Sequence, residues 1–519
     1  MQHDSIAVVD FGGQYAHLIA TKVRRHQVRA EILQPEDPIE AFKPFKGIIL
    51  SGSPALSAKG EDSNYNKQIY DLDTPILGFC FGHQEIAKHY GGEVFHGKQE
   101  WGAAKLHVLR DHPLFNGLGK VEEVWMSHND SVVGLGPDFE ELGYTILGKG
   151  GAEHRYAAIA SDKLRRYGFQ YHPEVDDTKH GDEMIGNFVR GICECEPSWT
   201  MESYLEEQIE SIKSEVGDRS VFLLASGGVD STVAARLLGA ALKPEQLHLL
   251  HVDHGLMRKD ESKEVVSAFK DMGLDTNLHF VDASGEFLSA LEGVIEPEKK
   301  RMIIGNTFLD VFDREARKLG LENDLLGQGT IYPDTVETGG TKRADTIKTH
   351  HNRVPLIEEL IAVGKVVEPL VELYKVEVRE LGEKLGVPSN MIWRHPFPGA
   401  GLGVRLLCSD GVVDISDSEL ERLSIAVQGT LAETELQSVT LPIRSVGVKA
   451  DLRVYEHPVL LHGNASWSQL EQAAGRIFNQ VKGVNRCIWN LTDSMPREFG
   501  ILPATMTRER LDLLREVDH

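Results

Sequence analysis

Short apolar runs that end at glycine or a polar residue constrain the fold of this chain more than any other feature. In the N-terminal third these runs lie at 6–10, 47–52 and 75–79. A helical stretch at 14–25 separates the first two. Strand, turn and helix in alternation are typical of a parallel sheet covered by helices. We therefore predict an α/β domain with a doubly wound parallel sheet.

The same pattern starts again in the middle of the chain. A helix is predicted over 201–216, and strands are predicted at 220–225 and 248–253. The last part of the chain mixes strands such as 445–448 with helices, which indicates a smaller α+β domain. A polar stretch at 193–198 has the composition of a linker.

These changes divide the 519 residues into three predicted domains. Three domains agree with a prior of roughly 100–200 residues each. We place them at 4–193, 199–394 and 395–519.

Charge and cysteine content narrow the class of protein. The formal net charge is −24, whereas a general nucleic-acid surface needs Lys and Arg to displace counterions. The five cysteines are too few and odd in number for a disulfide framework. No basic stretch precedes an apolar core at the N-terminus, and no apolar run reaches about 18 residues. We therefore expect a cytoplasmic protein that binds small molecules and neither nucleic acid nor membrane.

Cys80 lies in the sequence Gly78-Phe79-Cys80-Phe81-Gly82, between a predicted strand and a predicted helix. Glycine two residues before and after allows a sharp turn that exposes the thiol. The helix N-terminus favours the thiolate. A buried structural cysteine is the common alternative.

His172 and Glu174 supply the partners that a nucleophilic thiol needs. They lie in Tyr171-His172-Pro173-Glu174, after a later predicted strand. His172 could accept the thiol proton, and Glu174 could orient the imidazole. A histidine beside proline is otherwise usually a loop residue.

These motifs make residues 6 to about 190 resemble the class I glutamine amidotransferases. Further matching pieces are 10–15, 51–54 and 125–130. The resemblance implies Cys80 as nucleophile, His172 as base and Glu174 as its partner. It also implies backbone donors to an oxyanion at Gly52 and Phe81. The residues implied to hold glutamine are Gln84, Ser127, His128, Asn129 and Asp130. Ser53 stands where the family usually has a second glycine, which a loop tolerates if φ stays negative.

A second constellation follows the strand at 220–225. Its residues are Ser226, Gly227, Gly228, Val229, Asp230, Ser231 and Thr232, before a helix predicted over 233–242. Glycine amides, hydroxyls and the helix N-terminus together form an anion site. The Gly-Lys-Ser/Thr of a Walker A loop is absent.

This loop resembles that of the N-type ATP pyrophosphatases. The resemblance implies adenylation, in which pyrophosphate leaves ATP. It also places Val252 and Asp253, at the end of the next strand, toward the adenosine. Asp230 is a candidate ligand for Mg²⁺, which prefers carboxylate and phosphate oxygens. The alternative is an aspartate stabilised by the helix dipole.

Five further motifs resemble the GMP synthetases. They lie at 300–305, 327–334, 347–352, 394–399 and 441–448. The resemblance implies that glutamine supplies ammonia to ATP-activated XMP, and that the protein is a homodimer formed through its C-terminal domain. Arg301, Lys348 and Arg444 are candidates to bind the XMP phosphate, or are solvated surface cations. Another glutamine-dependent adenylating amidase, such as an NAD synthetase, and a catalytically silent homologue are the alternatives.

The C-terminus departs from this family. The usual Lys-Pro-Pro-Ala-Thr-Ile-Glu-Trp-Glu tail is similar only at 503–506, and an amphipathic helix over 507–516 follows, with Thr507 as its predicted N-cap. Residues 352–366 lack the usual double glycine, so the lid loop there is expected to differ. Either the tail closes on the XMP phosphate, or its helix is a packing element.

Overall fold

The computed structural model divides the chain into two compact units. It describes residues 3–12, 15–53, 65–147, 153–321, 324–337, 360–361, 364–395, 397–413, 415–449, 452–496 and 499–518. One unit runs to Gln208 and the other begins at Ile209. The division falls inside helix α5 (Met201–Val216), which was predicted with these same bounds.

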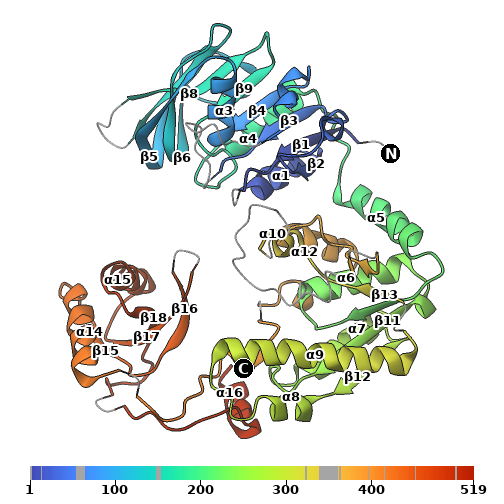
Figure 1. Ribbon diagram of the computed structural model, residues 1–519, viewed down its shortest axis with the longest axis vertical. Helices are drawn as coiled ribbons and strands as arrows, with labels where there is room; N and C mark the ends of the chain where they lie inside the picture. The colour runs from blue at the N-terminus through green and yellow to red at the C-terminus, as the bar shows by residue number, and fades with distance from the viewer. Residues whose placement is uncertain are drawn as a thin grey trace. The chain divides into compact units, whose positions relative to one another are not determined.

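A nine-stranded mixed sheet forms the first unit (Figure 1). Its strands are β1 (Ser5–Val9), β2 (Arg29–Leu33), β3 (Gly47–Leu50), β4 (Ile76–Phe79), β5 (Glu93–Val108), β6 (Val121–Gly134), β7 (Glu140–Leu147), β8 (Glu153–Ser161) and β9 (Arg166–Phe169). They are ordered β2-β1-β3-β4-β9-β8-β7-β5-β6. The half from β2 to β9 is parallel, as predicted. The other half is antiparallel, which the sequence did not indicate.

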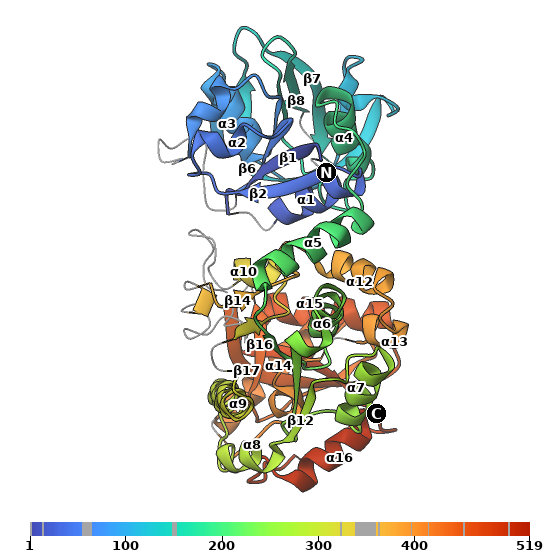
Figure 2. The ribbon, with the colours of Figure 1, turned by 90° about the vertical axis from the view of Figure 1, so that its right-hand side faces the viewer.

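Alternate residues of the parallel strands enter two separate cores. The helices beside them are α1 (Ala16–Arg25), α2 (Ile39–Phe42), α3 (Phe81–His89) and α4 (Gly181–Gly186). Ile6 and Val8 of β1 pack in the core that contains residues of α1 and α4. Ala7 and Val9 pack in the core that contains residues of α2 and α3. Successive strand side chains point to opposite faces, so helices cover both faces, as Figure 2 shows.

The polar stretch at 193–198 is packed against the first unit, and it is not a free linker. Cys193 and Cys195 are 5% and 2% exposed and belong to the first core. The Trp199 amide donates to the Gln27 carbonyl at 2.9 Å. Free cysteine behaves as a small hydrophobe, which explains why the two cysteines of this segment are buried, while its other four residues are exposed.

The second unit contains a parallel five-stranded sheet. Its strands are β10 (Val221–Leu224), β11 (Leu247–Asp253), β12 (Leu278–Asp282), β13 (Leu325–Gly327) and β14 (Val366–Val367). The order is β12-β11-β10-β13-β14, and all pairs are parallel. The helices are α6 (Val229–Ala241), α7 (Glu261–Asp271), α8 (Ser284–Ala290), α9 (Pro297–Leu319), α10 (Tyr332–Glu337), α12 (Lys375–Lys384) and α13 (Ser389–Ile392). Helix α6 begins earlier than predicted, because Gly228 is its N-cap.

The C-terminal part of the second unit is the predicted mixture of strands and helices. Its elements are α14 (Asp417–Thr430), β15 (Gln437–Thr440), β16 (Ser445–Lys449), β17 (Leu452–His462), α15 (Trp467–Gln480), β18 (Val484–Trp489) and α16 (Arg508–Asp518). Strand β17 pairs with the other three strands. Both this part and the parallel sheet lie in one compact unit, so a domain boundary at 394/395 stays a prediction. Among the described helices, none is long and apolar enough to cross a membrane.

Candidate active sites

Cys80 occupies a strained turn between β4 and α3. Its φ is 47° and its ψ is −100°, a conformation that costs a non-glycine residue about 1–3 kcal/mol. The flanking glycines make the turn possible. A Cβ at Gly78 would lie 2.3 Å from the Gly82 carbonyl carbon, and a Cβ at Gly82 would lie 2.5 Å from the Leu50 carbonyl oxygen. The predicted strand–Cys–helix turn is therefore present.

His172 and Glu174 form a buried pair beside this turn. His172 Nδ1 lies 2.7 Å from Glu174 Oε1, and the residues are 4% and 1% exposed. Burial alone would lower the pKa of His172, but the Glu174 carboxylate and the Cys80 sulfur outweigh it and hold the pKa well above its usual value. An imidazole with a raised pKa can hold a proton beside the Cys80 sulfur, as the predicted role of His172 requires.

Gly52 lies where β3 approaches both catalytic side chains. A Cβ at this position would be 3.1 Å from His172 Cε1 and 3.6 Å from Cys80 Cβ, so the absence of a side chain keeps the space open. The Ser53 hydroxyl donates to the Phe11 carbonyl at 2.9 Å, and Ser53 does not adopt positive φ. Ser53 thus fits in the place of a glycine because its φ is not positive, as predicted. Phe81 begins α3 and is 1% exposed.

The predicted glutamine-binding segment at 127–130 is part of β6, and it contacts the turn at Cys80. Cys80 Sγ lies 3.7 Å from the Ser127 carbonyl oxygen. Gln84 Nε2 donates to the Asp130 carbonyl at 2.7 Å. His128 and Asp130 are buried, whereas Asn129 is exposed. The alternation of a strand explains the difference, and Asn129 is therefore on the opposite face from His128 and Asp130.

The loop from Ser226 to Thr232, called the pyrophosphate loop for its predicted role, connects β10 to α6 in the second unit. Gly227 has φ +81°, and a Cβ there would lie 2.3 Å from Val265 Cγ2, so only glycine fits. The hydroxyls of Ser231 and Thr232 both donate to the Gly228 carbonyl, at 3.1 and 2.8 Å. Ser226 Oγ lies 3.0 Å from Ser231 Oγ. Val229 to Thr232 form the first turn of α6, and the N-terminus of a helix suits an anion.

Lys375 is a charged neighbour of this loop that sequence reasoning missed. Its Nζ lies 2.7 and 2.6 Å from the two carboxylate oxygens of Asp230. Lys375 is the first residue of α12, after the N-cap Tyr374. A cation there opposes the helix dipole, and this unfavourable placement is the sequence signal that could have identified it.

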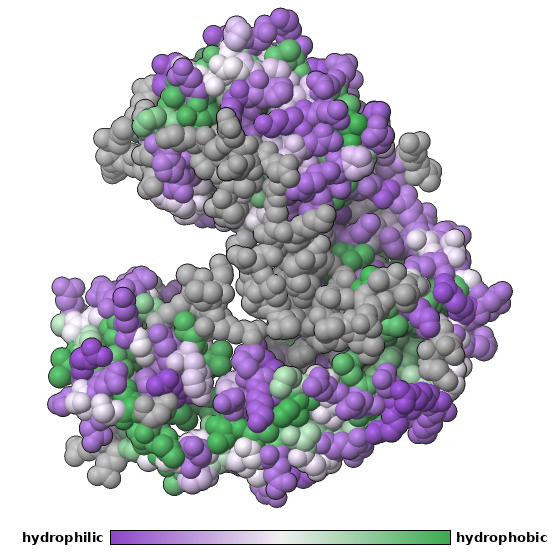
Figure 3. Space-filling model, in the orientation of Figure 1, coloured by the Kyte–Doolittle hydropathy of each residue, from purple (hydrophilic) through white to green (hydrophobic). Residues whose placement is uncertain are grey.

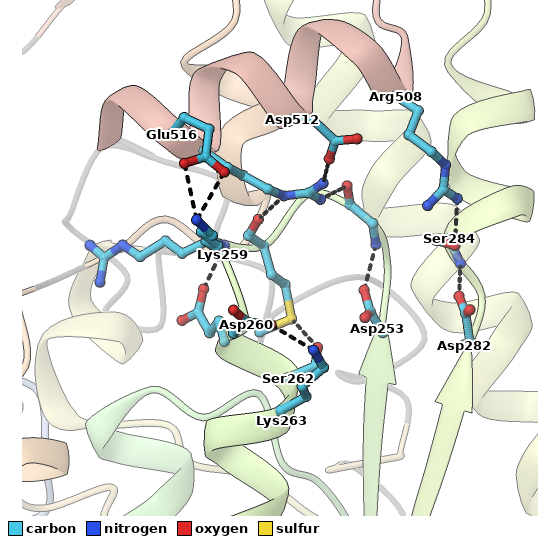
Figure 4. A pocket seen from close by; sticks show the side chains of 15 residues that line it. Asp253, Lys259, Asp260, Ser262, Lys263, Asp282, Ser284, Arg508, Asp512 and Glu516 are labelled. Carbon is cyan, nitrogen blue, oxygen red and sulfur yellow. Dashed lines mark hydrogen bonds and ion pairs between the residues drawn. The ribbon is translucent and has the colours of Figure 1, made fainter. Parts of the chain in front are cut away.

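The end of β11 is the second part of the predicted ATP site. Val252 is buried, and Asp253 Oδ1 accepts a hydrogen bond from the Gly255 amide at 2.9 Å. A pocket of about 370 Å³ opens beside Asp253 and Asp282, at the carboxyl ends of β11 and β12. Helix α16 forms its other wall (Figure 4). Carboxyl ends of parallel strands are the usual ligand-binding edge of such sheets.

Two of the three candidate phosphate cations, Arg301 and Arg444, lie among the described residues, in separate parts of the chain. Arg301 of α9 lies 3.7 Å from Glu298, one turn away. Arg444 directly precedes β16 and is half-buried. Lys348 lies outside the described residues. The neighbouring Lys300 is 1% exposed, and its Nζ donates to the Leu406 carbonyl at 2.7 Å, which is a structural role.

A magnesium site would draw on few protein ligands. Among the described residues, no group of three or more His, Cys, Asp or Glu side chains is arranged to hold a metal ion. Mg²⁺ is commonly bound by one or two carboxylates and substrate phosphates. Asp230, at the pyrophosphate loop, fits that pattern.

Residues 7–192 match the family model of glutamine amidotransferase class-I. Together with the Cys80–His172–Glu174 geometry, this match defines the class: a class I glutamine amidotransferase joined to a second α/β unit. The relatives called GMP synthase [glutamine-hydrolyzing] extend the match to nearly the whole chain. The protein from Aquifex aeolicus is 43% identical, covering 96% of this chain and 99% of the relative. That from Symbiobacterium thermophilum is 44% identical, covering 95% and 98%. This chain belongs to the glutamine-hydrolysing GMP synthases.

Proposed function

We propose that this chain makes GMP, using ammonia released from glutamine and ATP to activate XMP. The observation that carries the proposal is the presence, in one chain, of the buried thiol–imidazole–carboxylate group and the Ser-Gly-Gly-Val-Asp-Ser loop. The match to GMP synthases along nearly all of its length supports it. By-products are glutamate, AMP and pyrophosphate.

In the first site, the Cys80 thiolate attacks the glutamine amide. The backbone amides at Gly52 and Phe81 stabilise the oxyanion that forms. His172 carries the proton to the leaving ammonia, and Glu174 keeps the imidazole in position. Water then hydrolyses the glutamyl thioester. Gln84 and the 127–130 segment of β6 are proposed to hold the substrate.

In the second site, the loop from Ser226 to Thr232 binds the ATP phosphates, and Val252 and Asp253 face the adenosine. The C2 oxygen of XMP attacks the α-phosphate, and pyrophosphate leaves. Ammonia then displaces AMP to give GMP. Lys375 lies close enough to Asp230 to reach the departing phosphates. Arg301, Lys348 and Arg444 are proposed to bind the XMP phosphate.

Three finer points belong to the same proposal. Mg²⁺ bound with Asp230 would neutralise charge on the ATP phosphates. The protein is proposed to act in the cytoplasm. A homodimer is supported by large apolar side chains exposed in the C-terminal part: Trp467, Leu491 and Leu502 are 83%, 90% and 77% exposed. Apolar side chains also gather on the lower part of the face in Figure 3, which belongs to the second unit.

Release of AMP and pyrophosphate tests the function directly. The purified protein is incubated with ATP, Mg²⁺, glutamine and XMP, and AMP, pyrophosphate and GMP are quantified. We expect the three products in equal amounts. Deamido-NAD in place of XMP is the matched control and should give none. Turnover of deamido-NAD, or no turnover of either acceptor, would contradict the proposal.

A further inference from the structure

A fully buried carboxylate lies on β5, beside the predicted glutamine-binding segment of β6. Glu100 of β5 is 0% exposed, and a carboxylate in that position must be paired. Its Oε2 lies 3.2 Å from His128 Nε2 and 3.6 Å from His154 Nδ1. The Thr145 hydroxyl lies 3.3 and 3.4 Å from its two oxygens. Four adjacent strands therefore contribute to one buried polar cluster.

His128 is held at both of its ring nitrogens. Nδ1 lies 2.9 Å from the Asp130 carbonyl oxygen and 3.4 Å from Ser131 Oγ. A carbonyl only accepts, so Nδ1 donates to it. One further proton then lies in the contact between Nε2 and Glu100. The imidazole cannot rotate without breaking hydrogen bonds on both sides, which costs more in a buried site than at the surface.

The same Asp130 carbonyl connects this cluster to the nucleophile. It accepts from Gln84 Nε2 at 2.7 Å, and Gln84 lies one turn after Cys80 in α3, with its amide donating to the Cys80 carbonyl at 3.1 Å. Contacts thus connect Glu100 through His128 to the Asp130 carbonyl. From there they continue through Gln84 to the turn at Cys80.

We infer that Glu100 is a positioning residue for glutamine hydrolysis. By fixing His128, it fixes the 127–130 segment of β6 against α3, and so sets the width of the space in which the substrate amide meets Cys80. This inference rests on the proposed glutaminase function of the first unit. It assigns no contact between Glu100 and the substrate, because the Glu100 side chain is fully buried.

Glu100→Gln tests the inference, because it keeps the size of the side chain and removes the charge. Thr145→Val is the matched control: it removes a contact to the same carboxylate and leaves the Glu100–His128 contact in place. Three quantities are measured: the KM for glutamine, the rate of GMP formation from ammonia, and the rate of Cys80 alkylation by iodoacetamide. We expect Glu100→Gln to raise the glutamine KM about tenfold, as for one weakened charge-assisted contact. The ammonia-dependent rate and the alkylation rate should stay as in the wild type, and Thr145→Val should change the KM less than about twofold.

Other outcomes would overturn the inference. A glutamine KM unchanged in Glu100→Gln would do so, as would a parallel fall of the glutamine and ammonia reactions, since that indicates a general loss of structure. Should Glu100→Gln not fold, Glu100→Asp keeps the charge but withdraws it by one methylene; a normal glutamine KM in that variant would equally reject the role. A wild-type protein without glutamine-dependent activity would instead reject the proposed function, and this inference with it.

Discussion

Asp230 has two positively charged partners: Lys375 in the structure and Mg²⁺ in the proposed reaction. In the structure both carboxylate oxygens bond Lys375, and during turnover the same carboxylate is proposed to bind Mg²⁺ with ATP. Removing it leaves the Lys375 ammonium without this partner and the metal without its protein ligand. The first role concerns the geometry of the loop, and the second concerns the chemistry.

We therefore expect Asp230→Ala to lower AMP formation about 10- to 150-fold, equivalent to 1.5–3 kcal/mol for a lost charge-assisted contact. The loss should be equal with glutamine and with ammonia, because adenylation precedes amination. Asp218→Ala, at an exposed position of the same unit, is the control. Ammonia-dependent turnover near the wild-type rate would show that the loop is not the ATP site.

Residues differ in how far the sequence could identify them. Cys80, His172 and Glu174 lie in short motifs whose geometry is local: a two-glycine turn, and a histidine two residues from its carboxylate. Lys375 and Glu100 act through partners 145 and 28 residues away. Which side chain a charge meets at that separation depends on sheet register and helix docking, and local spacing does not contain that information.

At the scale of elements, the structure distinguishes between the two roles that the sequence left open for α16. Met506 and Leu511 are 4% and 0% exposed and lie in the core around the parallel sheet. Arg515 donates to the Gly255 and Met257 carbonyls at 2.6 and 2.9 Å. These contacts hold the loop after β11, beside Asp253 (Figure 4). They favour the packing element over a tail that closes on the XMP phosphate.

Arg515→Met should therefore lower the melting temperature and raise the KM for ATP. Two charge-assisted hydrogen bonds are lost, each worth about 1.5–3 kcal/mol. Arg422→Met is the control, because Arg422 is exposed on α14 with only a 3.7 Å contact to Glu419. Melting curves and KM values for ATP and XMP are compared.

Removal of the chain after Arg497 extends the same test. We expect lower thermal stability and effects on both substrates. A stable truncated protein with a raised KM for XMP alone would restore the hypothesis that the tail closes on the phosphate.

At the scale of the whole molecule, the parallel strands β1, β3, β4, β10 and β11 could be predicted because they are short apolar runs of the kind that a parallel sheet buries on both faces. The antiparallel half of the first sheet could not. In β6 exposed and buried positions alternate, but the buried Glu122 is charged, so the alternation of apolar and polar residues that would indicate a strand is broken in the sequence. The burial of Cys193 and Cys195 was missed for a different reason, since the exposed polar residues around them have the composition of a linker.

We propose glutamine hydrolysis for the first compact unit and ATP-dependent GMP formation for the second. A variant that loses only the first activity is the most direct test of this assignment. Cys80 lies in the first unit, and the pyrophosphate loop lies in the second. Cys80→Ala removes the proposed nucleophile and changes no residue of the second unit. We therefore expect glutamine-dependent GMP formation to be abolished, while ammonia-dependent formation stays within about twofold of the wild type, since the substituted side chain belongs to the other compact unit.

The assay uses added ammonium at high pH, where more of it is the free base that attacks adenylated XMP. Cys487→Ala, another cysteine of the chain that is half-buried in β18, is the control and should keep both activities. Equal loss of the two activities in Cys80→Ala would mean that the thiol serves more than glutamine hydrolysis. The assignment of one chemistry to each unit would then be wrong.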